Sequence, residues 1–155
     1  MQARDGSHGR GSYGRLAAEL AVNYVIMYLV MYTMIASLSH FYLNLNNTYM
    51  TLMMLAPMAA IMTYTMRSMF PSRRANAAVI VGAVVVFAAS FAAMRTQAAV
   101  GDAQFLRSMI PHHSGAILMC REASLTDPEI INLCREIVRS QESEIAQMKA
   151  LLRRY

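Results

Sequence analysis

The chain has 155 residues, of which 56% are hydrophobic and 15% are charged, and its formal net charge is +5 at pH 7. That length suits one domain, but so apolar a composition argues against an ordinary soluble one. A positive charge could indicate nucleic-acid binding, yet the Lys and Arg residues are spread between apolar segments and form no single basic patch. We therefore expect no nucleic-acid partner.

Residues 1–15 precede the first apolar segment and are rich in Gly, Ser and Arg. This composition predicts a disordered leader on the cytoplasmic side. The apolar run that follows is longer than the core of a signal sequence, which is about 7–15 residues. We expect this run to be retained as a membrane anchor.

Three apolar segments follow one another and approach the length of about 20 residues that a membrane-crossing helix needs. They cover roughly residues 16–38, 49–66 and 75–94. A chain of this size has too little other sequence to bury three such helices in a soluble core. The sequence therefore predicts an all-α protein whose residues 16–94 form three transmembrane helices in the lipid bilayer.

The arginines around these segments alternate with stretches that have no cation. The loop at residues 40–48 has no Lys or Arg, whereas six arginines lie on the other side of the segments: Arg4, Arg10, Arg15, Arg67, Arg73 and Arg74. Cytoplasmic loops carry an excess of positive residues. We therefore predict a multi-pass protein of the inner (plasma) membrane, with a cytoplasmic N-terminus and with residues 95–155 outside the cytoplasm.

The second apolar segment has a methionine at every fourth position. The stripe consists of Met50, Met54, Met58, Met62 and Met66, and Pro57 interrupts the backbone ladder beside it. Methionine is a flexible side chain that commonly fills gaps between helices, and this is the interpretation we favour. A ladder of thioethers that conducts Cu(I) is the alternative.

Residues 95–155 read as two helices joined by a turn. Asp102 can cap a first helix that extends to about Ala123, with Pro111 inside it as a kink or a restart. Thr126 and Glu129 fit a capping box for a second helix that continues to the C-terminus. One hairpin is too small to bury a core of its own. We therefore expect two chains to pair into a four-helix bundle, as a homodimer or within a higher oligomer.

The second of these helices has a predicted core face of apolar residues at three-four spacing. It consists of Ile130, Cys134, Ile137, Gln141, Ile145, Met148 and Leu152.

The first of these helices contains two adjacent histidines within a run that is otherwise apolar and rich in methionine. His112 shares a face with Phe105, Met109, Ala116 and Met119, while Met109 and His113 are four residues apart and can meet. Folding the hairpin brings Glu144 and Met148 level with them. Imidazole and thioether form a ligand set that suits Cu(I), Ag(I) or another soft or borderline metal. The alternative is that these residues are core methionines and hydrogen-bonded histidines.

The two cysteines, Cys120 and Cys134, lie on the two helices of the hairpin, in what we expect to be an oxidising compartment. They could form a disulfide, bind a soft metal as thiolates, or remain as unpaired buried residues. The sequence leaves these three possibilities open.

The order of several motifs resembles the bacterial family called domain of unknown function 305. The similar positions are Asp102, Phe105, MIPHH, Ala116, Met119, Gln141, Glu144, Ile145 and Met148, and the membrane part, HFYLNLNNTYMTLMMLAPM, is similar to a three-span module in some members. The resemblance implies a ferritin-like helical bundle, and some members are linked to copper binding and copper tolerance outside the cytoplasm. It implies metal-binding roles for Asp102, Met109, His112, His113, Met119 and Met148. Many relatives repeat the His-His motif, whereas this chain has one copy.

The function predicted from the sequence is a membrane-anchored protein that binds copper outside the cytoplasm, for sequestration or transfer. One alternative is a structural oligomerising module without metal, and another is a Cu(I) transporter that uses the methionine stripe. We expect no enzyme activity, because the sequence shows no nucleophile–base pair and no open catalytic metal triad. The absence of an HExxH motif and of Glu-x-x-His pairs argues against hydrolytic zinc and di-iron chemistry in particular.

Overall fold

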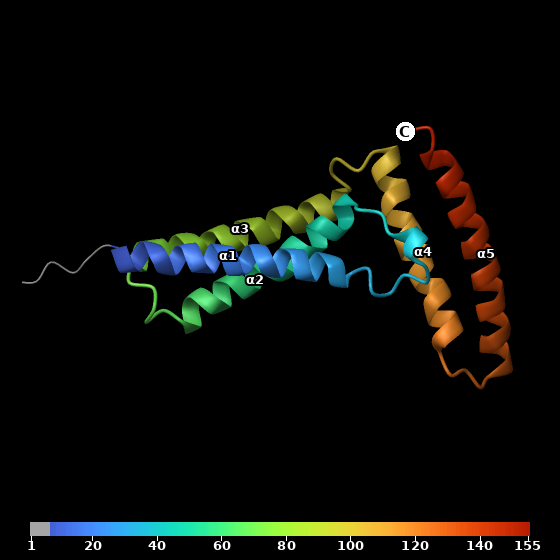
Figure 1. The fold of residues 1–155 in the computed structure, drawn as a ribbon, viewed down its shortest axis with the longest axis horizontal. Coiled ribbons are helices and arrows are strands. Elements are labelled where there is room, and N and C mark those ends of the chain that lie inside the picture. The colour runs from blue at the N-terminus through green and yellow to red at the C-terminus, as the bar shows by residue number, and fades with distance from the viewer. Residues whose placement is uncertain (1–6) are drawn as a thin grey trace, which may run out of the picture. The chain divides into compact units, whose positions relative to one another are not determined.

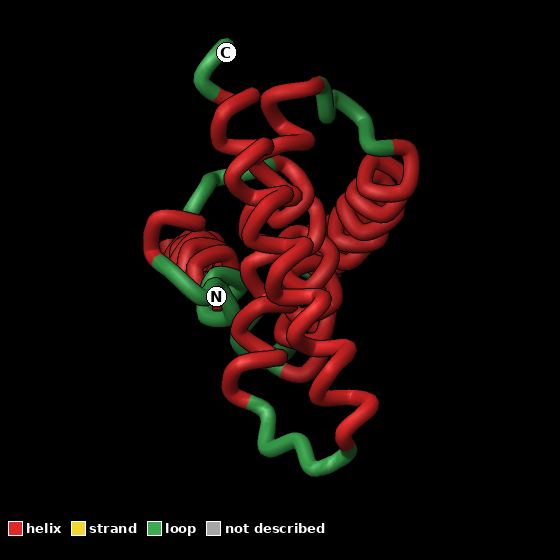
Figure 2. The backbone as a smooth tube through the Cα atoms, turned by 90° about the vertical axis from the view of Figure 1, so that its right-hand side faces the viewer, coloured by secondary structure: helices red, strands yellow, loops and turns green. Residues whose placement is uncertain are grey.

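The computed structural model of the chain describes residues 7–155, and within them it contains helices and loops without a strand (Figures 1 and 2). The all-α prediction is confirmed. In chain order the elements are α1 (Ser7–Val30), η1 (Leu38–His40), α2 (Leu45–Thr65), α3 (Arg73–Thr96), α4 (Asp102–Glu122) and α5 (Pro128–Leu152).

The chain divides into two compact units. The first comprises the residues up to Tyr28 together with Thr48–Ala98, and the second comprises Leu29–Asn47 together with Ala99–Tyr155. Because α1 begins at Ser7, it includes residues 7–15 of the predicted leader, and residues 1–6 lie outside the described part.

Small residues occupy the buried positions of α2 and α3 in the first unit. On α2 the buried side chains include Ala56, Ala59 and Thr63, and on α3 they are Ala83 and Ser90. Side chains of this size let helix backbones approach closely, and a threonine inside a helix can return its hydroxyl to the backbone. The Thr63 hydroxyl does so by donating to the Ala59 carbonyl over 2.8 Å.

An aromatic contact joins the start of α1 to the loop before α3. The Tyr13 hydroxyl donates to Asn76 Oδ1 over 2.6 Å, and the Tyr13 ring lies 5.1 Å from the Phe70 ring between centroids. Phe70 is itself buried. This end of the unit is therefore held by specific contacts as well as by packing.

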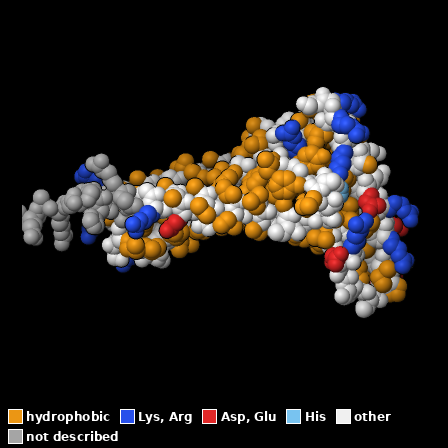
Figure 3. All heavy atoms as spheres, in the orientation of Figure 1, with side chains coloured by type: hydrophobic (Ala, Val, Ile, Leu, Met, Phe, Trp, Pro, Cys, Tyr) orange, Lys and Arg blue, Asp and Glu red, His pale blue; other side chains and the backbone are white. Residues whose placement is uncertain are grey.

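One helix within residues 7–155, α3, is long and apolar enough to cross a membrane, and the prediction of three transmembrane helices is wrong. Polar residues explain the difference: α1 contains Arg15, Glu19 and Asn23, and α2 has two asparagines in its first turn and contains Pro57. In addition, α1 ends at Val30, well before the predicted boundary at residue 38. The apolar side chains of α3 point mainly outward, and Figure 3 shows apolar side chains across the visible surface of this unit.

The second unit is a hairpin of α4 and α5 around a small apolar core (Figure 1). The core residues are Leu106, Ile110, Ile117, Ile145 and Met148. Ala36 and Tyr42, from the segment before α2, pack against the same core. This segment covers part of the apolar surface that two helices cannot enclose between themselves.

The predicted core face of α5 is correct at its C-terminal half and wrong at its start. Ile145 and Met148 are buried, whereas Ile130 is 46% exposed. Val138 packs against the core. The start of α5 lies beyond the last core residue of α4, and there Ile131 rather than Ile130 faces the apolar side chains of Ala123 and Leu125 near the turn.

Both predicted helix starts in the hairpin differ by one residue from those observed. The N-cap of α4 is Gly101, and Asp102 is the first helical residue. The N-cap of α5 is Asp127, whose carboxylate accepts a hydrogen bond from the Glu129 N–H over 2.8 Å. Because Pro128 occupies the first helical position, the cap is the residue directly before it, and Thr126 is not used. Pro111 lies within α4, which continues through it to Glu122.

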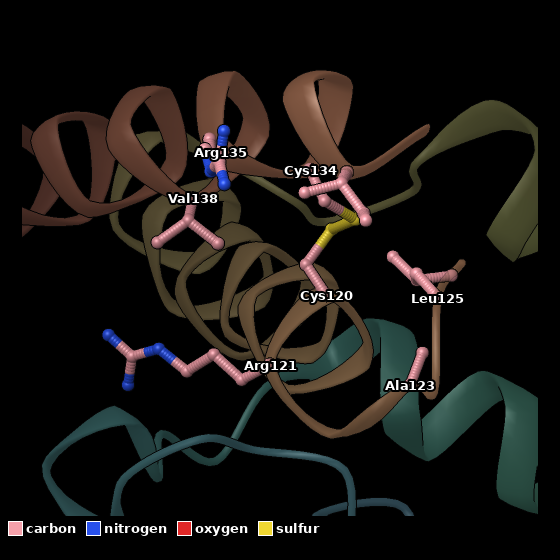
Figure 4. A pocket seen from close by; sticks show the side chains of 8 residues that line it. Cys120, Arg121, Ala123, Leu125, Cys134, Arg135 and Val138 are labelled. Atoms are coloured by element: carbon pink, nitrogen blue, oxygen red, sulfur yellow. A yellow bond between two sulfur atoms is a disulfide. The ribbon is translucent and has the colours of Figure 1, made fainter. Parts of the chain in front are cut away.

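A disulfide bond joins the two helices near their turn. Cys120 of α4 and Cys134 of α5 are bonded, with their Cα atoms 5.3 Å apart. Figure 4 shows the two sulfur atoms between the helices, next to the side chains of Leu125 and Val138. Of the three possibilities that the sequence left open, the structure selects the disulfide, and these sulfur atoms are not available as thiolate ligands.

Candidate functional site

A contact between an imidazole and a carboxylate, both predicted metal ligands, joins the two helices of the hairpin. Nδ1 of His113, on α4, lies 2.9 Å from Oε2 of Glu144, on α5. The imidazole is largely enclosed, with 14% of its side chain exposed, and Glu144 is more open. Although the distance is short, the contact lacks hydrogen-bond alignment, and within the described residues Nδ1 has no hydrogen-bond partner. A ring nitrogen without a hydrogen bond is a potential ligand for a metal ion.

His112 lies beside this pair but faces differently. Its ring centroid is 6.0 Å from that of His113, with the rings at 60° to each other, and its side chain is exposed. Adjacent residues on a helix diverge by about 100°, which explains the separation. Met109 is one helical turn before His113 and packs against the edge of the core. The predicted residues that gather here are therefore Met109, His112, His113 and Glu144.

Three other predicted ligands lie elsewhere in the hairpin. Asp102 is at the start of α4, where its Oδ2 accepts a hydrogen bond from the Tyr155 hydroxyl over 3.0 Å. This bond raises the pKa of Tyr155. Met148 is a core residue, and Met119 is 60% exposed near the other end of α4. Asp102 and Met119 are not brought to the His113–Glu144 contact, and Met148, one helical turn after Glu144, is enclosed in the hairpin core.

Within residues 7–155, no three side chains of His, Cys, Asp or Glu come together closely enough to hold one metal ion. The His113–Glu144 contact supplies two such donors. A complete site on this hairpin would therefore need thioether ligands or donors from another molecule.

The predicted methionine stripe is not uniform in burial, because Met58 and Met62 on α2 are half-buried and Met66 follows the last residue of that helix. Met50, Met54 and Met66 are exposed. The hollow between α2 and α3 is lined instead by Ala56, Pro57, Ala60, Ile61, Ala83, Val84 and Phe87.

A polar contact that the sequence analysis missed lies one residue from His113. The Ser114 side chain is fully buried, and its Oγ accepts a hydrogen bond from the Ala36 N–H over 2.7 Å. The same oxygen lies 2.8 Å from Nδ1 of His40. The sequence does contain one indication of this contact, namely a serine at a core-facing position of α4 between Ile110 and Ile117. This contact holds the segment before α2 against α4.

The His40 contact should weaken in acid. Burial, and then the positive charge of Lys149, lower the pKa of His40 below its ordinary value. Because the folded protein binds this proton less tightly than the unfolded chain, the contribution of His40 to stability is complete above about pH 6.5 and is lost as the pH falls from there through the lowered pKa. We expect the amides of residues 36–44 to exchange hydrogen faster at pH 5.5 than at pH 7.5, after correction for intrinsic rates. The variant His40→Gln should remove most of this pH dependence, and an equal dependence in that variant would contradict the assignment.

The fold and the site together define an all-helical protein with a disulfide-bonded hairpin that carries a His-Glu contact between its helices. Residues 72–152 match the family described as a domain of unknown function (DUF305), and the chain belongs to that family. The matched region contains α3 as well as the whole hairpin.

A related protein is found in a virus of amoebae. The chain is 34% identical over 112 residues to the uncharacterized protein L153 of Acanthamoeba polyphaga mimivirus. The matched region covers 71% of this chain and 72% of that relative. No solved structure matches the chain.

Proposed function

We propose that the protein binds copper, as Cu(I), on the hairpin of α4 and α5, and sequesters the ion or transfers it to another molecule. The proposed ligands are His113, Glu144 and the thioether of Met109 of one chain, together with His112 of a second copy. Copper is the cargo in this proposal, and the chain's own side chains provide the binding energy.

The observation that carries the proposal is the enclosed Nδ1 of His113, which lies 2.9 Å from a carboxylate without a hydrogen bond. A buried polar atom without a hydrogen bond costs free energy, of the order of 1–3 kcal/mol. A metal ion between the imidazole and the carboxylate would remove that cost. The thioether at Met109 favours a soft ion, because thioethers bind Cu(I) and Ag(I) better than Mg²⁺ or Ca²⁺.

The remaining ligands are provided by a second copy of the chain. Phe105, His112 and Met119 are exposed on α4 at seven-residue intervals, so they lie along nearly the same side of the helix. A solvent-facing row that contains two large apolar side chains supports pairing with another hairpin. His112 in this row would then reach the site of the partner, and a homodimer or a higher oligomer would complete two sites.

The protein is attached to a membrane through α3, with the hairpin outside the cytoplasm. Of the 18-residue apolar window in α3, 11% is buried inside the chain, whereas the core helix of a soluble protein would be mostly buried. Arg73 and Arg74 at its start favour the cytoplasmic side for that end. The Cys120–Cys134 disulfide supports an oxidising compartment for the hairpin.

The test is a competition titration with Cu(I) and a chromophoric Cu(I) chelator, using the full-length protein in a neutral detergent. Loss of a direct ligand is expected to weaken binding at least as much as loss of a residue that only orients one, which is about 10- to 100-fold. We expect this loss in His113→Ala and in Glu144→Gln, and a smaller loss in Met109→Leu, which conserves the volume of the side chain.

Matched variants away from the hairpin face control for the loss of a histidine or a methionine as such. His40→Gln removes an imidazole that contacts Ser114, and Met69→Leu removes an exposed thioether from the loop before α3. Both should bind Cu(I) like the parent. Equal affinity in the His113, Glu144 and Met109 variants would refute the copper site.

A further inference from the structure

A groove with cationic and apolar walls lies between the hairpin and the segment before α2. It has a volume of about 590 Å³. Three cations line it, Arg107 from α4 with Lys149 and Arg153 from α5 and its end, and the apolar lining consists of Phe41, Tyr42, Leu43 and Leu152. We call it the cationic groove.

The charges in the cationic groove are not neutralised by the protein. Within residues 7–155 the two ion pairs are His113–Glu144 and Arg121–Glu142, and neither includes a cation of the groove. None of the described residues that line the groove is Asp or Glu. Lys149 donates a hydrogen bond from Nζ to Ser39 Oγ over 3.1 Å, which holds its ammonium group in place without cancelling its charge. The groove therefore attracts an anion.

The apolar wall adds a second requirement for the ligand. Leu43 is 58% exposed and Phe41 is also exposed, although both lie beside the charged groups. Exposed leucine and aromatic side chains next to cations match a ligand that has an anionic group and a hydrocarbon part. A free phosphate ion would use the cations and leave Phe41 and Leu43 in water.

Chain connectivity places such a ligand within reach. Residues 97–101 connect α3 to α4, and so short a connection spans at most about 20 Å. Arg153 belongs to the same end of the hairpin as this connection, because the Tyr155 hydroxyl bonds to Asp102 at the start of α4. If α3 crosses the membrane, this connection tethers the end of the hairpin that carries Arg107 and Arg153 to the bilayer surface.

We propose that the cationic groove binds an anionic phospholipid of the surrounding bilayer. Arg107, Lys149 and Arg153 contact the phosphate headgroup, and Phe41 and Leu43 contact the glycerol and the upper acyl chain. The inference shares with the proposed function the membrane crossing by α3 and is independent of copper, so the two can fail separately.

The experiment measures transfer of a labelled lipid to the full-length protein in neutral detergent without added metal. The chain has no tryptophan, so Leu43→Trp introduces one energy-transfer donor at the groove. The acceptors are phosphatidylglycerol and phosphatidylcholine that carry pyrene on an acyl chain. We expect at least tenfold tighter binding of phosphatidylglycerol, because the groove has three cations and no acidic residue.

Two triple variants in this background test whether the groove is the site. Each cation near anionic lipid contributes about a fivefold change in affinity, so replacing Arg107, Lys149 and Arg153 with glutamine should weaken phosphatidylglycerol binding by roughly a hundredfold. Arg121, Arg135 and Arg139 carry the same total charge on the same hairpin, and their replacement with glutamine should change binding less than about threefold. Arg107→Lys with Arg153→Lys preserves the charges and should keep most of the binding.

Three results would overturn the inference. The first is equal binding of the two lipids, and the second is an equal loss in the two triple variants. The third is complete displacement of labelled phosphatidylglycerol by millimolar glycerol phosphate, which would show that the groove recognises a soluble phosphate ester.

Discussion

Replacing Ile110 with alanine is expected to lower the free energy of unfolding of the hairpin by about 2–5 kcal/mol. Ile110 has no exposed surface and lies among Leu106, Ile117, Ile145 and Met148 in the core of the hairpin. The variant loses the transfer free energy of the missing carbon atoms. It also leaves a cavity in the core, because two helices cannot rearrange enough to fill it. Hydrogen exchange of the α4 and α5 amides in the full-length protein, followed by mass spectrometry, measures the change.

Ile130→Ala is the matched control for this substitution. Ile130 is on α5 in the same hairpin but 46% exposed, so its truncation should change stability by less than about 0.5 kcal/mol. If the two variants exchanged alike, the hairpin core would not be where the structure places it.

The hairpin was the most predictable part of the fold, because its signals are local. An apolar three-four spacing and a Pro-containing start sufficed to locate α4 and α5 to within a few residues. The exact caps were missed because Thr126 and Asp127 are both good capping residues, and the position of Pro128 decided between them.

The membrane segments were less predictable, because polar residues lie within two of the apolar runs. Length and overall composition favoured three transmembrane helices, but Arg15, Glu19 and Asn23 reduce the apolar character of α1, and α3 is the described helix that retains it. The many small residues of α3 did not indicate that this segment would differ from the other two in apolar character.

The candidate site was predictable in its ingredients and not in its arrangement. Spacing along α4 placed Met109 near His113, and folding the hairpin placed Glu144 level with both. Which ring faces Glu144 depends on the rotation of α4 about its axis, and this rotation is set by the burial of Ile110, Ser114 and Ile117. The docking of Ala36 and His40 on Ser114 is a contact between segments far apart in the sequence, and no local sequence pattern predicts it.

Removing the disulfide by replacing Cys120 and Cys134 with serine is expected to lower the stability of the hairpin by about 3 kcal/mol, measured by the same hydrogen exchange. The two cysteines are 14 positions apart, so the bond closes a loop that contains the whole turn between α4 and α5. Without it the unfolded chain gains conformational freedom, whereas the core residues from Leu106 to Ile117 keep their contacts. Opening should therefore increase most in the turn and at the start of α5, where Ile130 and Leu133 are exposed and little packing holds the helix.

The double serine variant also separates the disulfide from the copper site. Reduction of the native protein would expose two thiolates that bind Cu(I) strongly, whereas serine leaves no such ligand. Because His113 and Glu144 are held by the core rather than by the turn, the variant should retain Cu(I) binding close to that of the parent while it loses stability. Unchanged exchange in the turn would mean that the bond is not formed in the protein, and lost copper binding at intact helicity would place the sulfur atoms in the metal site.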